Sequence, residues 1–251
     1  MAVKRKGLTA LVVIGLTVVA LIAAYFIVDA VLRNVAENRI KQEITNNLPE
    51  GVTGDVSVSI GGMSVIAQYL SGTFDKVDLS APALSVNGAD ADVRIVAMDV
   101  PLDQNKTVGH VQGTVQIDQA ALNTLIQTSP DAPDGEVVLG DNQISYTGEI
   151  SVLGFPVGYE ATATPEAAGP FVTFTPTGAT ITTGLGTLDA SSLVQKVLGQ
   201  SPISVCVAQY LPNGLEVTGV NVTPEYARVT VAANNTLKLN SESLSTVGSC
   251  G

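Results

Sequence analysis

The chain has 251 residues with 12 basic and 23 acidic side chains, one His, two Cys and no Trp, and its net charge is −11. One His and two Cys are too few for a Cys/His zinc site, and the acidic balance argues against nucleic acid, which selects basic surfaces. Because 45% of the residues are hydrophobic and 14% are charged, the composition indicates a folded chain rather than a disordered one.

The N-terminus carries a membrane-targeting segment. A basic cluster at residues 4–6 precedes 21 uncharged residues, 8–28, which reach about 31 Å as a helix and match the thickness of a hydrocarbon core. Since basic residues stay on the cytoplasmic side, residues 1–28 are predicted to be a cytoplasmic stub and a single-pass signal anchor in the plasma membrane. A cleaved signal peptide is the alternative, and both interpretations place residues 29–251 outside the cytoplasm, in the periplasm or cell envelope.

Residues 29–50 are predicted to continue from the membrane as a helical stalk. Apolar residues recur at helical spacing from Leu32 to Ile44, and Pro49 then ends the helix. After Gly51 the apolar residues alternate with polar ones, which is typical of strands. We therefore expect residues 51–251 to form one extracytoplasmic domain.

The domain is predicted to be α+β and mostly antiparallel, with short helices between strands. Asp118 and Asp189 are candidate caps for two of the helices, and Pro82 and Asn87-Gly88 are candidate turns. The predicted helices are 63–70, 118–126 and 189–198. The predicted strands are 56–60, 77–79, 84–86, 93–97, 111–117, 137–139, 144–152, 157–163, 171–174, 215–222, 227–231 and 237–239.

Cys206 and Cys250 are predicted to form a disulfide, because two Cys in an exported chain most simply pair. The bond would close a loop of about 45 residues, for which chain entropy gives an upper estimate of about 4 kcal/mol. The alternative is a pair of free thiols in a reducing compartment.

The sequence contains no recognisable catalytic or metal-binding motif. It has no Gly-x-Ser-x-Gly elbow, no P-loop and no dinucleotide fingerprint. His110 begins a strand and is interpreted as structural, and the acids of residues 90–103 do not follow the spacing of a calcium loop. We predict a protein that is not an enzyme and that uses no metal and no cofactor. A pair of carboxylates that converge in space stays open as an alternative.

The strands and short helices are built from Val, Ile, Leu, Ala and Thr, with few charges. This pattern fits a packed core, and it also fits an apolar groove for acyl chains. If a groove is present, its lining is predicted to come from the short helices and inner strand faces. The candidate lining residues are Met63, Ile66, Leu70, Phe74, Leu122, Leu125, Ile126, Phe155, Leu193 and Val197.

Three segments carry a family resemblance: GMSVIAQYLSGTFDKV at 62–77, GTVQIDQAALN at 113–123 and CVAQYLPNGL at 206–215. With the order of elements around them, roughly residues 35–240 resemble the actinobacterial LmeA-like family of cell-envelope proteins. The resemblance implies phospholipid binding and a role in elongating or maintaining the mannan of lipomannan and lipoarabinomannan. It also implies an elongated, strongly curved antiparallel sheet wrapped around short helices, as in tubular lipid-binding domains.

We therefore interpret the chain as a membrane-anchored extracytoplasmic protein that binds phospholipid and performs no catalysis. One alternative is a structural or scaffolding envelope protein whose apolar surface packs against a protein partner. A less favoured alternative is a glycolipid-processing enzyme, which would need convergent carboxylates of raised pKa in a cleft.

Overall fold

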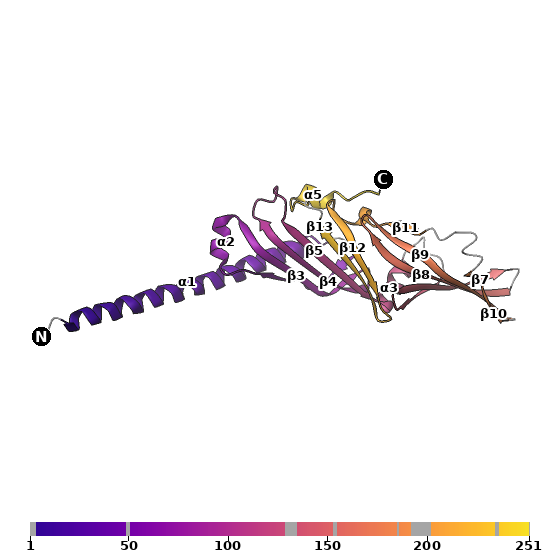
Figure 1. Ribbon diagram of the computed structural model, residues 1–251, viewed down its shortest axis with the longest axis horizontal. Helices are drawn as coiled ribbons and strands as arrows, with labels where there is room; N and C mark the ends of the chain where they lie inside the picture. The colour runs from indigo at the N-terminus through magenta and orange to yellow at the C-terminus, as the bar shows by residue number, and fades with distance from the viewer. Residues whose placement is uncertain are drawn as a thin grey trace.

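The protein is an elongated molecule in which one long helix and two antiparallel sheets follow one another (Figure 1). The N-terminus lies at one end of the long axis, and the second sheet lies at the other. The computed structural model describes residues 4–48, 51–128, 135–152, 155–184, 186–191, 202–233 and 236–250.

Helix α1 (Lys4–Asn46) joins the predicted anchor and the predicted stalk into one continuous helix of 43 residues. No Pro precedes Pro49, so nothing in the sequence interrupts the backbone hydrogen bonds. The N-terminal half extends away from the sheets, and the C-terminal half lies alongside the first sheet (Figure 1). Within Val13–Asn46 the most apolar window has a mean hydropathy of 2.3 and is 6% buried, so this helix is long and apolar enough to cross a membrane.

The first sheet has seven strands in the order β1-β3-β4-β5-β13-β12, with β2 also paired to β3. Its long β3–β4 hairpin turns at Asn87 and Gly88, whose φ values of 50° and 87° suit the left-handed turn that the sequence predicts. The strands are β1 (Val52–Thr53), β2 (Ser57–Ile60), β3 (Thr73–Val86), β4 (Ala89–Pro101), β5 (His110–Asp118), β12 (Leu215–Val222) and β13 (Tyr226–Ala233).

The second sheet has six strands in the order β10-β9-β8-β7-β6, with β11 also paired to β9. It joins the first sheet where the Val217 amide of β12 donates to the Gly169 carbonyl after β8, at 2.9 Å. The strands are β6 (Glu136–Gly140), β7 (Gln143–Val152), β8 (Phe155–Ala168), β9 (Phe171–Thr183), β10 (Gly186–Asp189) and β11 (Ile203–Cys206).

In the described part of the chain, four short helical elements accompany the sheets. Helix α2 follows β2, α3 follows β5, and a 3-10 turn, η1, leads into β12. Helix α5 lies near the C-terminus, and the sequence did not indicate it. Their bounds are α2 (Val65–Ser71), α3 (Gln119–Thr128), η1 (Ala208–Tyr210) and α5 (Ser241–Ser245).

Two of the local predictions are wrong. The segment 237–239 is not a strand: it makes one isolated bridge, Thr107 to Lys238, because Leu237 and Leu239 instead pack into a core cluster. Pro82 does not end a strand but lies inside β3, at a shift in register between Ala81 and Leu84. Pro has no amide hydrogen to donate, and a register irregularity is where a sheet tolerates it.

The predicted α+β class and the antiparallel pairing are confirmed. Among the described strands, neither sheet closes on itself or curls strongly, so a sheet wrapped around the helices stays a prediction. Most of the predicted helix 189–198 lies outside the described residues. Its proposed cap, Asp189, ends β10 and accepts a hydrogen bond from the Ser191 amide at 2.8 Å.

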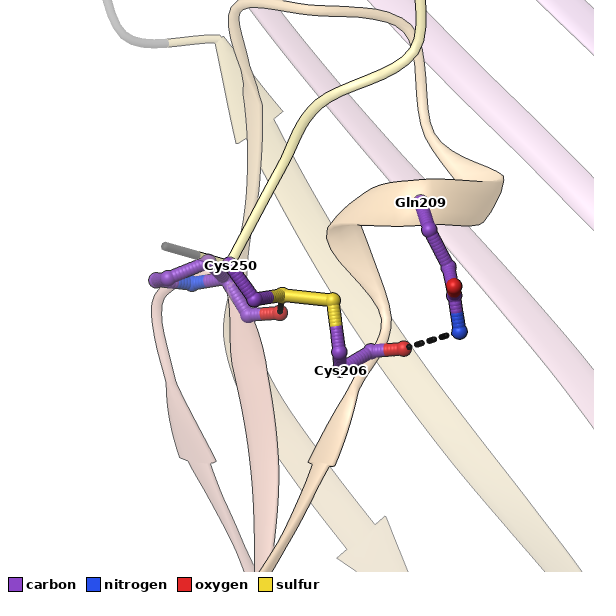
Figure 2. The surroundings of a disulfide bond; sticks show 4 residues. Cys206, Gln209 and Cys250 are labelled. Atoms are coloured by element: carbon purple, nitrogen blue, oxygen red, sulfur yellow. Dashed lines mark hydrogen bonds between the residues drawn. A yellow bond between two sulfur atoms is a disulfide. The ribbon is translucent and has the colours of Figure 1, made fainter.

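A disulfide joins Cys206 and Cys250, as the sequence predicts, and ties the C-terminal tail to the end of β11 (Figure 2). Their Cα atoms are 5.9 Å apart. Around the bond, the Gln209 side chain donates to the Cys206 carbonyl at 3.1 Å. The tail is therefore held beside η1 and the junction of the two sheets.

Replacing both cysteines, Cys206→Ser with Cys250→Ser, is expected to lower the free energy of unfolding by about 2–4 kcal/mol, because the bond spans 44 residues of otherwise unconstrained unfolded chain. Urea unfolding of the full chain in detergent micelles measures the change. The unsubstituted protein under a reducing agent is the control and should lose the same amount. Equal stability in all three states would contradict the prediction.

Candidate functional site

One face of the first sheet is apolar across three adjacent strands. Cross-strand pairing aligns Val93 of β4 with Val115 of β5, and Val115 with Val229 of β13. The neighbouring rows on this face are formed by Ala, Ile, Gly and Val residues in the same register. Val115, at the centre, is 39% exposed, so the middle of this face is only partly covered.

Both ends of this apolar face are covered. At the end near α2, Val77, Val100, Val108, Val111 and Leu237 form a buried cluster. Towards the other end, Leu122 and Ile126 of α3 pack against a second cluster that includes Val222. The central exposed stretch therefore lies between two packed regions of the same sheet.

The end of α1 adds a small apolar pocket of about 160 Å³ beside the first sheet. Ile44 and Leu48 from the helix face Leu79 and Ile95 from β3 and β4. The helical spacing of Ile44 in the predicted stalk thus serves packing against the sheet rather than exposure to solvent.

The second sheet holds a larger pocket of about 340 Å³, and none of the described residues that line it is charged. Three of its residues, Val137, Ile144 and Tyr146, also belong to the cluster that α3 covers. The apolar faces of the two sheets are therefore continuous through that cluster. The pocket is lined by Val137, Ile144, Tyr146, Ala161, Thr162, Ala163, Phe174, Pro176, Gly178 and Ile203.

The opposite face of the first sheet is polar. A depression of about 360 Å³ is lined by Asp92, Arg94, Thr114, Gln116 and Arg228. The Arg94 guanidinium donates to the Asp92 carboxylate at 3.1 and 3.2 Å, and these bonds raise the pKa of Arg94. Arg228 donates to the Gln116 side chain at 2.6 Å. Both arginines thus have hydrogen-bond partners on the same face of the sheet, which is typical of a solvated surface.

A polar joint fixes α1 to α2, where the apolar run of the helix ends. Asp29 is 4% exposed, and its carboxylate accepts from the Ser64 hydroxyl at 2.7 Å and the Ile66 amide at 3.0 Å. The Tyr25 hydroxyl lies 2.6 Å from the same Ser64 oxygen. Ser64 also caps α2 by accepting from the Ala67 amide.

Two further side chains extend the joint along the next turns of α1. Arg33 donates to the Ile60 carbonyl at 2.6 Å and to the Gly62 carbonyl at 3.0 Å, and it pairs with Asp29 at 3.6 Å. Glu37 accepts from the Ile60 amide at 2.8 Å. Asp29, Arg33 and Glu37 follow at intervals of four residues, so they form one stripe on the helix.

Eight of the ten predicted lining residues lie in the described part of the chain, and these eight are distributed over several elements. Phe74 packs at the cluster near α2, and Leu122 and Ile126 pack at the cluster under α3. The other five described residues are half-buried or exposed, and they lie just before α2, on α2, on α3 and at the start of β8. Ile66 and Leu125 are half-buried, and Met63, Leu70 and Phe155 are exposed. Leu193 and Val197 lie outside the described residues.

Sequence reasoning missed the residues of the larger pocket. Ile144 and Tyr146 on β7 and Phe174 on β9 line the same pocket, with β8 between their strands. Their signal was the alternation of apolar and polar residues along each strand, which shows a shared face only once the strand order is known.

Comparison with known families identifies the chain. A model of the LmeA-like phospholipid-binding family matches residues 27–232. The chain belongs to this family. The matched region of this LmeA-like protein begins just before the joint at Asp29 and includes both sheets, and it ends before α5 and the disulfide-bonded tail. No curated protein and no solved structure is detectably similar to the chain.

Ser64→Ala is expected to lower the free energy of unfolding by about 1–2 kcal/mol, because it removes the cap of α2 together with a donor to Asp29. Urea unfolding in micelles measures this. Ser59→Ala, at an exposed position of β2, is the matched control and should change little. Equal effects of the two substitutions would mean that the joint contributes nothing to stability.

Proposed function

We propose that this LmeA-like protein is held in the plasma membrane by α1 and binds phospholipid outside the cytoplasm, with acyl chains on its apolar surface and without catalysing a reaction. The observation that supports this most directly is the uncharged pocket of about 340 Å³ in the second sheet. Its volume lies in the range of small-molecule sites. The family description independently names phospholipid as the ligand.

The physical basis of binding is removal of acyl methylenes from water. Each buried methylene contributes about 0.8 kcal/mol, so a few contacts with Ile144, Phe174 and Ile203 suffice for useful affinity. The partly exposed face around Val115 extends the apolar surface towards the membrane end of the molecule. The candidate lining residues on α3, Leu122 and Ile126, lie between these two regions.

The proposed location follows from charge, length and redox chemistry. The basic residues before the apolar run favour a cytoplasmic N-terminus, and a disulfide persists in an oxidising compartment. The contacts of Tyr25 and Asp29 with Ser64 support an uncleaved anchor, since cleavage near residue 28 would remove part of the joint. In this proposal residues 1–28 anchor the chain, 29–50 support it and 51–251 bind lipid.

We further propose that lipid binding supports elongation or maintenance of envelope mannan. The support is the family resemblance of segments 62–77, 113–123 and 206–215. In this role the protein would hold or present a lipid to the machinery that builds lipomannan.

A photoactivatable phospholipid with a diazirine on its acyl chain tests the binding site. In vesicles containing this lipid, the full chain should form cross-links to β7, β8 and β9 as well as to α1. Ala163→Phe places a ring in the pocket and should reduce the sheet cross-links severalfold. Mass spectrometry of the labelled peptides is the readout.

Glu160→Phe is the matched control, because it adds the same ring to the opposite face of β8. This variant should label like the unsubstituted protein. Cross-links confined to α1 in every variant would show that the chain touches lipid only through its anchor, and the binding proposal would then fail.

The proposed role in mannan is tested by complementation. A strain lacking the protein should make lipomannan of altered size, and the unsubstituted gene and Glu160→Phe should restore it, because both keep the pocket. Ala163→Phe should not. Gel mobility of extracted lipomannan measures the outcome, and full rescue by Ala163→Phe would separate mannan processing from the pocket.

A further inference from the structure

Helix α2 exposes an apolar surface that the lipid-binding proposal does not use. Met63 is 87% exposed and Leu70 is 80% exposed, and Tyr69 and Leu102 add to the same region. The Leu102 amide donates to the Gly72 carbonyl at 3.0 Å, so Leu102 lies beside the C-terminal end of α2, whereas Met63 precedes its N-terminal end. We name Met63, Tyr69, Leu70 and Leu102 the α2 patch.

The outward side of α2 is apolar because its polar anchor points inward. Gln68 is buried, donates to the Gly61 carbonyl at 2.9 Å and accepts from the Asp75 amide at 2.8 Å. Helical spacing places Ile66 and Leu70 on the side opposite Gln68. The helix has seven residues, and the exposure of Tyr69 and Leu70 on it, with Met63 just before it, indicates a surface for an apolar partner.

The joint with α1 fixes the height of the α2 patch above the membrane. Ser64, the cap of α2, is bonded to Asp29 and lies beside Tyr25. The uncharged run of α1 ends at Val28, so α2 sits at the level where the hydrocarbon core would end. Figure 1 shows α2 at the end of the sheets that faces the free half of α1.

Charge supports the same orientation. Residues 51–251 carry 19 acidic and six basic side chains, whereas residues 61–74 carry none. An anionic leaflet repels an acidic surface, and the uncharged stretch around α2, which lies beside the end of the apolar run of α1, adds no such repulsion.

We propose that the α2 patch inserts into the outer leaflet of the membrane that α1 spans, so that the domain is fastened at two points. This inference rests on the proposed membrane-spanning role of α1. The ligand surface is the bilayer itself, with Leu70 and Met63 among the upper acyl carbons and Tyr69 at the headgroup level, where aromatic side chains are common. The two contacts hold the membrane end of the first sheet against the leaflet.

The absence of Trp from the chain makes the test direct, since one introduced Trp is the only such fluorophore. Leu70→Trp is made in the full chain, which is reconstituted in phosphatidylcholine and phosphatidylglycerol vesicles with brominated acyl chains. Leu70→Trp should lose most of its fluorescence to bromine and should emit at shorter wavelength than Glu160→Trp in the same vesicles. Tyr69→Trp is a second reporter on the same helix, in case Leu70→Trp does not fold.

Two controls separate the possible failures. Phe26→Trp reports the span itself, and Glu160→Trp reports a position on the second sheet, on the face opposite the pocket. If Phe26→Trp is quenched and Leu70→Trp is quenched no more than Glu160→Trp, insertion of the α2 patch is wrong while the anchor stands. If Phe26→Trp is not quenched, the anchor is wrong and the inference fails with it.

Discussion

The structure depends on a buried carboxylate at the point where an apolar helix meets a β domain. The Asp29 side chain is buried, and its carboxylate accepts hydrogen bonds from the Ser64 hydroxyl and the Ile66 amide at the start of α2 and pairs with Arg33. A buried charge is tolerated only when such partners are present. The need to keep these hydrogen bonds to Asp29 therefore fixes the position of α2 relative to α1. The position of the whole domain relative to the free half of α1 follows from that requirement.

The second constraint is the two-residue period of the strands. In the first sheet it separates an apolar face around Val115 from a polar face where Asp92 and Gln116 pair with arginines. In the second sheet it gathers Ile144, Tyr146 and Phe174 into one uncharged pocket. In the proposed binding of phospholipid this sidedness has a function, because acyl chains need a surface that is apolar and still accessible.

The sequence predicted what local periodicity and composition control. The apolar run of α1, the turn at Asn87 and Gly88 and the pairing of Cys206 with Cys250 all follow from local patterns or from compartment. The pocket could not be predicted in this way, because its residues come from five strands whose order depends on long-range pairing. The joint at Asp29 was missed for a related reason: its partners Ser64 and Ile66 are more than 30 residues away, and nothing in the spacing links them.

The continuity of α1 has a mechanical consequence. Because the helix runs without a break from Lys4 to Asn46 and is hydrogen-bonded to α2 on the way, it connects its N-terminal half rigidly to the sheets. In the proposed membrane-anchored arrangement, a rotation of the spanning half about its axis would rotate the domain with it. A neighbouring membrane protein that packed against the span would therefore set the orientation of the apolar face about the axis of α1, without contacting that face.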